Sequence, residues 1–438
     1  MHNMIPYGGV LQNTIAFQLG KVLGLPSPQD AVFVRVYINE DYRGLYQLVN
    51  KVSVGVMGLN IYDLDDENKF LNSMDMGECP IYEKGELYHP GHRKGVNLPE
   101  ESDDCTGGYL LEGVTRPSMY SKDASGFVSD VGSLVRIRKP EYASAKEVEY
   151  IADFFNRIET AVRSSDGVDP LSGKDWEEYV DKASFARYYL VQEVMQNGDA
   201  GMNSFFMYKD IDEVSDKLFA GPIWDFDWFI PGHDQDLWAC AKQSSNGNVI
   251  SSGGMLYYLW QHEPFRKQAM TDYVRILYPA IHDMIESGYI DSLQNLLYDE
   301  LLADSVRWSS PWNVSVNKSL ADAKDRLLRR SEFLQQIWSE DSVNWVCVKM
   351  QGTVFPARDV YTYGKKDLGV HVRPLPVIEP TDPYSKYYDA MTGEELHLDT
   401  ILYSDHVITV QQRFPPQWKI LYRRIVRKIQ KTMLNNNL

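Results

Sequence analysis

The sequence lacks several patterns that would assign it to a familiar class of enzyme. No G-x-G-x-x-G occurs, so neither a dinucleotide-binding turn nor a glycine-rich phosphate loop is visible. No H-E-x-x-H and no G-x-S-x-G is present, which disfavours zinc proteases and α/β-hydrolases. The stretch from Gly167 to Lys174 resembles a Walker A loop, but its spacing is one residue too long and Asp175 replaces the required Ser or Thr.

Cysteine, positive charge and long apolar runs are also scarce. The chain has four cysteines in 438 residues and no C-x-x-C pair, so we expect neither a thiolate zinc site nor a disulfide framework. Its net charge of −17 disfavours a nucleic-acid-binding surface over the whole molecule. No apolar run approaches the roughly 20 residues of a membrane-spanning helix, and Met1 to Pro6 do not resemble a secretory signal. As written, the chain is therefore expected in the cytoplasm.

What the sequence does contain is ample material for packed cores. Hydrophobic residues make up 44% of the chain, with 28 Tyr and 10 Trp. The length suggests roughly two or three domains. Strand-like patterns come first and helical patterns second, which favours an α+β fold.

The first part of the chain, residues 1–144, is predicted to be strand-rich. An amphipathic helix is expected first, then a β-hairpin that turns at Asn39 to Asp41, and later two further strands. Between the hairpin and those strands, residues 60–105 are polar and predict an irregular surface excursion. The expected elements are the helix 13–24, the hairpin strands 32–38 and 44–49, and the strands 108–112 and 134–138.

The second part, residues 145–340, is predicted to be helical, and the third, residues 341–438, to be a small β-rich appendage. Helical spacing covers residues 145–163, 175–196, 264–305 and 318–340. The appendage ends in a segment with seven basic residues between Arg413 and Lys431 and apolar residues at helical spacing. Such a basic amphipathic helix suits an anionic membrane, an acidic partner or the acidic surface of this protein itself.

The most informative stretch runs from Phe185 to Trp228. A predicted helix ends at Asn197 and Gly198, Asp199 follows at once, and Asn203 comes four residues later. Two short strands, 204–209 and 217–224, then form a hairpin that runs into Asp225, Phe226 and Asp227. A hairpin of this kind brings groups 26 residues apart into one cleft.

This order of elements is typical of a phosphotransferase centre. Phosphoryl transfer needs a carboxylate that orients the attacking hydroxyl and accepts its proton, and oxygen ligands that hold magnesium against the phosphates. We therefore predict Asp199 as the base and Asp225, Asn203 and Asp227 as metal ligands. In W-D-F-D-W the two carboxylates sit among bulky apolar groups, where a charge is costly without a metal or another partner.

Four segments together resemble the CotH kinase family, known from a spore-coat protein. They are GPIWDFDW, LVQEVMQNGDAGMNSFFMYKD, GGYLLE and VRVYINEDYRGLYQLV, and the similarity extends from about Leu11 to Trp338. The resemblance implies a two-lobed core like that of protein kinases, with an N-lobe-like region that begins later than is usual in the family. It also implies ATP-dependent phosphorylation of protein substrates, with Asp199 as the catalytic aspartate and Asp225 as the metal-binding one.

A kinase needs cations that bind the nucleotide phosphates, and we expect them in the I-R-K-P stretch before the long helix. Arg138 and Lys139 are the candidates, and Glu112 of G-G-Y-L-L-E is expected to pair with one of them. The cofactors predicted are ATP and Mg²⁺ or Mn²⁺. Glu193, His233 and Asp234 are weaker candidates for places near the same cleft.

Three functions remain open on the sequence. The first is an atypical kinase that phosphorylates a protein, such as a coat or surface protein. The second is an inactive kinase-like scaffold in a spore coat or cell envelope. The third, a glycosidase, ranks last because Asp225 and Asp227 are two residues apart on an extended segment, too close to flank a sugar ring.

Overall fold

The computed structural model describes thirteen stretches of the chain. They are residues 11–26, 31–55, 58–227, 237, 239–240, 254–307, 316–338, 343–351, 358–365, 370–371, 386–397, 400–402 and 406–411. The chain divides into two compact units, Met1–Cys240 with Ser252–Ser339, and Ala241–Ser251 with Glu340–Leu438. The mixture of helices and sheets is consistent with the expected α+β class, but a two-lobed kinase-like core is not confirmed.

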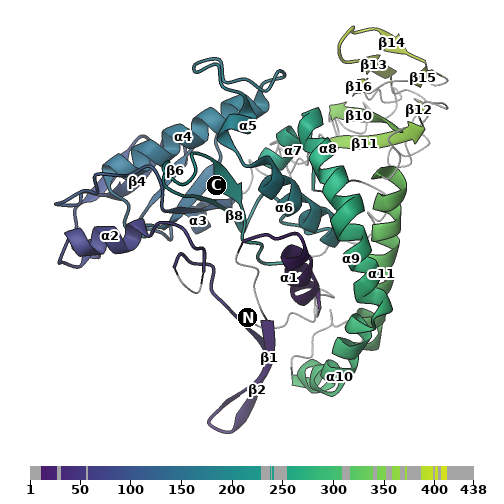
Figure 1. Ribbon diagram of the computed structural model, residues 1–438, viewed down its shortest axis with the longest axis horizontal. Helices are drawn as coiled ribbons and strands as arrows, with labels where there is room; N and C mark the ends of the chain where they lie inside the picture. The colour runs from purple at the N-terminus through teal and green to yellow at the C-terminus, as the bar shows by residue number, and fades with distance from the viewer. Residues whose placement is uncertain are drawn as a thin grey trace, which may run out of the picture. The chain divides into compact units, whose positions relative to one another are not determined.

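A seven-stranded antiparallel sheet forms the centre of the first unit (Figure 1). Its strand order is β3-β4-β6-β7-β5-β8-β9, so strands from both of the expected lobes belong to one sheet. The strands β8 and β9 follow the helix α6 in sequence, yet β8 pairs directly with β5. The bounds are β3 Ile81–Lys84, β4 Arg93–Val96, β5 Tyr109–Val114, β6 Gly126–Val128, β7 Leu134–Lys139, β8 Phe205–Lys209 and β9 Leu218–Ala220.

The prediction of an irregular excursion over residues 60–105 is wrong. This stretch forms the helix α2 (Leu64–Leu71), a turn of 3₁₀-helix (Met76–Glu78) and the strands β3 and β4. The charged side chains of β4 hid it from a hydrophobicity pattern. Arg93 is buried against Glu149 and Asp153, and the Lys94 ammonium donates to the carbonyls of Tyr120 and Asp123.

The long helix α4 (Ala145–Arg163) lies where its pattern predicts and packs over β4 and β6 (Figure 1). Its apolar face is buried, and Phe155 meets Phe127 of β6 edge to face at 5.5 Å between ring centroids. A capping box begins the helix, because the Ser144 and Glu147 side chains each accept a hydrogen bond from the other's backbone N–H.

The expected helix over residues 175–196 is two helices, α5 (Trp176–Tyr179) and α6 (Lys182–Met195). The break falls where Val180 forms a β-bridge with Leu218 and Asp181 caps α6 through the backbone N–H of Ser184. Helix α6 is buried nearly all round, between α1 (Gln12–Val22), β9, α8 and α11.

Helices α8 and α11 pack against α6, α9 and α10 pack against α11, and α7 packs against α4 (Figure 1). The expected helix 264–305 is interrupted by a π-helical turn (Tyr273–Leu277) and by Gly288, whose φ is +72°. The short helix α3 (Pro117–Tyr120) follows β5. The bounds are α7 Met255–Leu259, α8 Glu263–Asp272, α9 Tyr278–Glu286, α10 Tyr289–Arg307 and α11 Val316–Trp338.

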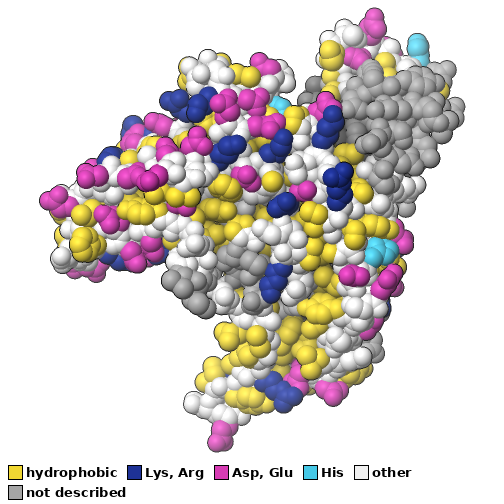
Figure 2. Space-filling view, viewed as in Figure 1, with side chains coloured by type: hydrophobic (Ala, Val, Ile, Leu, Met, Phe, Trp, Pro, Cys, Tyr) yellow, Lys and Arg dark blue, Asp and Glu magenta, His cyan; other side chains and the backbone are white. Residues whose placement is uncertain are grey.

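The predicted hairpin is present as β1 (Ala31–Ile38) and β2 (Asp41–Val49). It turns through Asn39 and Glu40, both in the left-handed region. The hairpin lies beside α10, where the backbone N–H of Leu45 donates to Asp304 at 2.8 Å. Figure 2 shows hydrophobic side chains at the surface of this region. Val32, Leu48 and Val306 are exposed large hydrophobic residues of the hairpin and α10.

The second unit is strand-rich, as predicted. Its five-stranded sheet has the order β11-β10-β16-β13-β14, and β12 pairs with β15. The predicted basic helix from Arg413 to Lys431 lies outside the described residues. No helix in the described stretches is long and apolar enough to cross a membrane. The bounds are β10 Val343–Gln351, β11 Arg358–Lys365, β12 Val370–His371, β13 Lys386–Asp389, β14 Glu395–Leu396, β15 Ile401–Leu402 and β16 His406–Gln411.

Candidate functional site

The loop that carries Asp199 starts where α6 ends. Gln196, not the expected Asn197 or Gly198, takes the left-handed conformation that ends the helix (φ 48°, ψ 46°). Asn197 then connects two loops: its side-chain oxygen accepts from the Asp199 N–H (3.2 Å), and its amide nitrogen donates to the Asp225 carbonyl (3.3 Å). The two predicted catalytic aspartates are thus brought together through one side chain.

Asp199 is half-buried and is oriented by Asn203. The Asn203 amide nitrogen donates to Oδ1 of Asp199 at 2.8 Å. The amide oxygen accepts from both the backbone N–H and the hydroxyl of Thr115, each at 2.9 Å. Because a backbone N–H can only donate, the atom facing Thr115 must be the oxygen, which fixes the orientation of the amide.

Asp225 lies just after β9 and is held in the left-handed region, with φ +66°. The Ser204 hydroxyl donates to its Oδ2 at 3.0 Å. The next residue, Phe226, is buried and its N–H donates to the side-chain oxygen of Asn13 at 2.8 Å. Helix α1 therefore fixes the chain directly after Asp225.

Backbone strain is concentrated around these residues. Of the six non-glycine residues with positive φ in the described chain, three surround the aspartates: Gln196, Ser204 and Asp225. Conformations of this kind cost free energy and persist where the surrounding structure enforces them, often at functional sites. The contact between Ser204 and Asp225 places two such residues together.

Burial and the charge of Asp225 raise the pKa of the two neighbouring carboxyl groups, Asp199 and Asp227. Burial, and then the neighbouring Asp225 carboxylate, raise the pKa of Asp227 to about 6. Burial also raises the pKa of Asp199, while the hydrogen bond from Asn203 opposes the rise, Asp225 adds to it and Arg116 opposes it. Crowded carboxylates of this kind are stabilised by a cation.

The oxygen donors around Asp225 fit a magnesium ion. Asp225 lies close enough to Asp227 to raise the pKa of that carboxyl, and magnesium is commonly held by one or two carboxylates together with substrate phosphates. Asn203 is less available as a ligand in this arrangement, because its oxygen already accepts two hydrogen bonds from Thr115.

The predicted phosphate-binding cations are already paired with carboxylates. Arg138 lies 3.0 Å from Asp123 and 3.6 Å from Glu112, so one of the expected pairs exists. Glu112 is closer to Arg136, at 3.0 Å, and both of these side chains are buried. Burial raises the pKa of Glu112, opposed by the two arginines.

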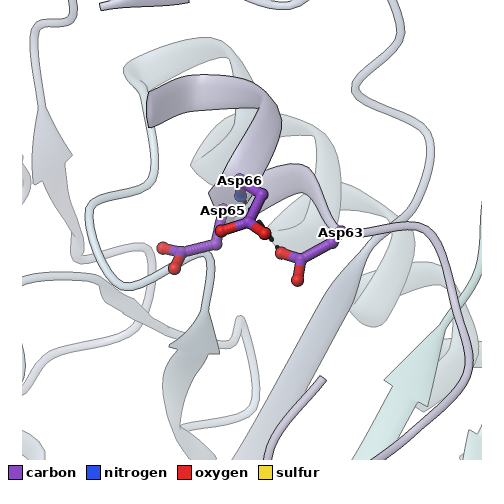
Figure 3. Close-up of side chains that lie close together, drawn as sticks. All are labelled: Asp63, Asp65 and Asp66. Carbon is purple, nitrogen blue, oxygen red and sulfur yellow. Dashed lines mark hydrogen bonds between the residues drawn. The ribbon is translucent and has the colours of Figure 1, made fainter. Parts of the chain in front are cut away.

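Lys139 points to a different part of the molecule. Its ammonium lies 2.6 Å from Asp65, which also accepts from Lys69 (2.7 Å) and from the backbone N–H of Glu141 (2.8 Å). Asp65 belongs to an acidic group at the start of α2 with Asp63 and Asp66, and Figure 3 shows Asp63 accepting from the Asp66 N–H. Among the described residues, this group is the only cluster of three carboxylates with ligand atoms within 4.8 Å of one another.

The weaker candidates do not enter the site as described. Glu193 is fully buried on the other side of α6, in an ion pair with Arg330, and also accepts from the Ala239 N–H at 2.8 Å. His233 and Asp234 lie outside the described residues.

Several residues of the site could not be identified from the sequence. Thr115, Asn13 and Arg136 carry no motif, and each reaches the site through contacts between distant segments. Ser204 lies within a segment that resembles the family, but nothing there marks it as a partner of Asp225. Arg138 and Lys139 are successive residues of β7, so their side chains leave opposite faces of the strand and reach different partners.

Comparison with known sequences agrees with the resemblance seen in the motifs. The family described as CotH kinase protein matches residues 1–334, which include every site residue discussed above. No curated protein sequence gives a significant match to the chain. The chain therefore belongs to the CotH kinase family.

Proposed function

We propose that this protein is an ATP-dependent kinase that uses Mg²⁺ or Mn²⁺ and phosphorylates a hydroxyl group of a protein. The observation that carries the proposal is the link through Asn197, which joins the Asp199 loop to the carbonyl of Asp225. It brings a carboxylate suited to a base and a carboxylate suited to a metal into one site, on a chain that belongs to a kinase family.

Asp199 is the residue that would act on the acceptor. Its Oδ1 is held by Asn203, which leaves Oδ2 to orient the acceptor hydroxyl and take its proton as the oxygen–phosphorus bond forms. Burial keeps its pKa above the usual value, which makes the carboxylate a better base.

Asp225 and Asp227 are the residues that would hold the metal. The effect of Asp225 on the raised pKa of Asp227 marks a pair of carboxylates whose repulsion a divalent ion would relieve. The metal, when bound, would neutralise charge on the phosphates. The strained backbone at Asp225 fixes the direction of its carboxylate before any ligand arrives.

Calorimetric titration with ATP, with and without magnesium, tests the nucleotide site. Wild type should bind ATP only with magnesium, and Asp225→Ala should lose that binding. Asp216→Ala, at an exposed aspartate in the turn between β8 and β9, is the matched control and should bind like wild type. Absence of binding by the wild type would contradict the proposal.

Turnover separates the kinase from the scaffold that remains as the alternative. The scaffold is favoured by the pairing of Arg138 and Lys139 with carboxylates, which leaves neither cation open to phosphate. Radiolabelled ATP with candidate acceptor proteins should give phosphoprotein with wild type and none with Asp199→Ala. Binding of ATP without any transfer would support the scaffold instead.

A further inference from the structure

One arginine beside Asp199 differs from the cations considered above. Arg116 follows directly after Thr115, at the end of β5, and Thr115 is tied through both of its donors to the oxygen of Asn203. Asn203 in turn holds Asp199. Two hydrogen-bonded steps therefore fix the backbone of Arg116 against the loop of the predicted base.

The guanidinium of Arg116 is available to a ligand. The residue is exposed, and no other described residue forms an ion pair or a hydrogen bond with its side chain. Its backbone carbonyl accepts from the N–H groups of Met119 and Tyr120, which anchors the residue at the start of α3. Arg136, Arg138 and Lys139 are by contrast each engaged with at least one carboxylate.

Phosphoryl transfer requires such a cation. Negative charge is spread over the three equatorial oxygens of the group in transit, and an arginine fork matches those oxygens better than a point charge. The site as described presents Asp199, Asp225 and Asp227, a set of carboxylates that would repel the group. The positive charge of Arg116 already acts on Asp199, since it lowers the pKa of that carboxyl against the effect of burial.

We infer that Arg116 is a catalytic residue that donates hydrogen bonds to the phosphoryl group as it passes from ATP to the acceptor. The inference rests on the proposed kinase function. In the step, the bond from the γ-phosphorus to the leaving oxygen of ADP breaks and the bond to the acceptor oxygen forms. The acceptor proton goes to Asp199, and Arg116 remains protonated throughout.

Binding of a transition-state mimic tests this role without turnover. ADP with magnesium and fluoroaluminate resembles the group in transit, and its affinity is measured by calorimetry beside ADP with magnesium alone. Arg116→Ala should bind ADP with magnesium like wild type but lose most of the gain from fluoroaluminate, and Arg116→Lys should retain part of it. Arg157→Ala, at an exposed arginine of α4, is the control and should keep the full gain.

Kinetics give the second measurement. An arginine that contacts the phosphoryl group only in transit should lower kcat by at least about 100-fold on removal, with little change in the KM for ATP. A rise in the acceptor KM at unchanged kcat would overturn the inference, because it would place Arg116 on the acceptor. An unchanged fluoroaluminate gain in Arg116→Ala would also overturn it.

The two proposals fail in distinguishable ways. If wild type binds no ATP, the kinase function fails and the role of Arg116 fails with it. If wild type binds ATP and transfers phosphate while Arg116→Ala behaves like Arg157→Ala, only the role of Arg116 is lost.

Discussion

The Asn203 amide donates to Asp199 at 2.8 Å while its oxygen accepts two hydrogen bonds from Thr115 at 2.9 Å. The amide therefore cannot rotate without losing all three hydrogen bonds. Asn203 fixes Asp199 to the end of β5, whatever part it takes in holding a metal. Thr115, which lies 88 positions from Asn203 in sequence, thus helps to set the direction of the predicted base.

Asn203→Asp should shift the pH dependence of phosphorylation to higher pH. A carboxylate at this position cannot donate to Asp199 when ionised, and its negative charge raises the pKa of Asp199 further. The base is then protonated over a wider range, so the acidic limb of the kcat/KM profile moves upward. Asn203→Ala, which removes the donor without adding charge, should move it less. An Asn203→Asp profile that coincides with that of wild type would contradict this arrangement.

Magnesium should stabilise the protein more at pH 7.5 than at pH 5. Asp227 has a pKa raised from 3.8 to about 6, so the folded state holds its proton more tightly than the unfolded state. Stability from this group is present at low pH and is lost as the pH rises through that range. Above it, the ionised pair of Asp225 and Asp227 is repulsive and open to a metal.

Thermal melting with and without magnesium at the two pH values checks this. Asp227→Asn is the matched variant: without metal it should melt higher than wild type at pH 7.5, and it should lose much of the response to magnesium. An equal rise in Tm with magnesium at pH 5 and pH 7.5 would be the contrary result.

The parts of the fold that follow local rules were predictable from sequence. Helix α4 shows its amphipathic spacing and the Ser144 to Glu147 capping box. Strand β5 is a short, mostly apolar run, and β7 alternates apolar and basic residues. The strand β4 was not predictable, because Arg93 and Lys94 are satisfied by groups on α4 and on the segment after α3.

The candidate site likewise has parts that the sequence predicts and parts that it does not. Asp199 and Asp225 stand in recognisable motifs, but their partners depend on long-range pairing. Gly113 of β5 lies opposite Phe205 of β8, and this register brings Thr115 to Asn203. No local pattern encodes that register. The sequence alone therefore predicts Arg138 and Lys139 as the phosphate-binding cations.

Glu147→Gln should change the stability of the protein in a pH-dependent way. Burial raises the pKa of Glu147 to about 7, against the hydrogen bonds from Ser144 and Asn68. The stability from this group is lost as the pH rises from about 4.5 towards 7, whereas Gln carries no such loss. The free energy of unfolding of Glu147→Gln relative to that of wild type, measured by urea denaturation, should therefore be higher at pH 8 than at pH 5. Glu147→Ala also removes the titrating carboxyl, together with the acceptor for the Ser144 N–H, so it should be less stable than Glu147→Gln by about 1 kcal/mol at both pH values. If the difference in free energy of unfolding between Glu147→Gln and wild type is the same at both pH values, the raised pKa of Glu147 is contradicted.

Arg330→Met should destabilise the protein strongly, by about 3 to 5 kcal/mol, because it removes the arginine that forms an ion pair with the buried Glu193 carboxylate. Both side chains are completely shielded from solvent, and Arg330 also donates through Nε to the Glu193 carbonyl at 3.2 Å. The double variant Glu193→Gln with Arg330→Met removes both charges yet keeps an oxygen to accept from the Ala239 N–H. It should be more stable than Arg330→Met alone, as measured by chemical denaturation. If the double variant is the less stable of the two, loss of the ion pair is not the reason that Arg330→Met destabilises the protein. The pair would then not be what joins α6 to α11.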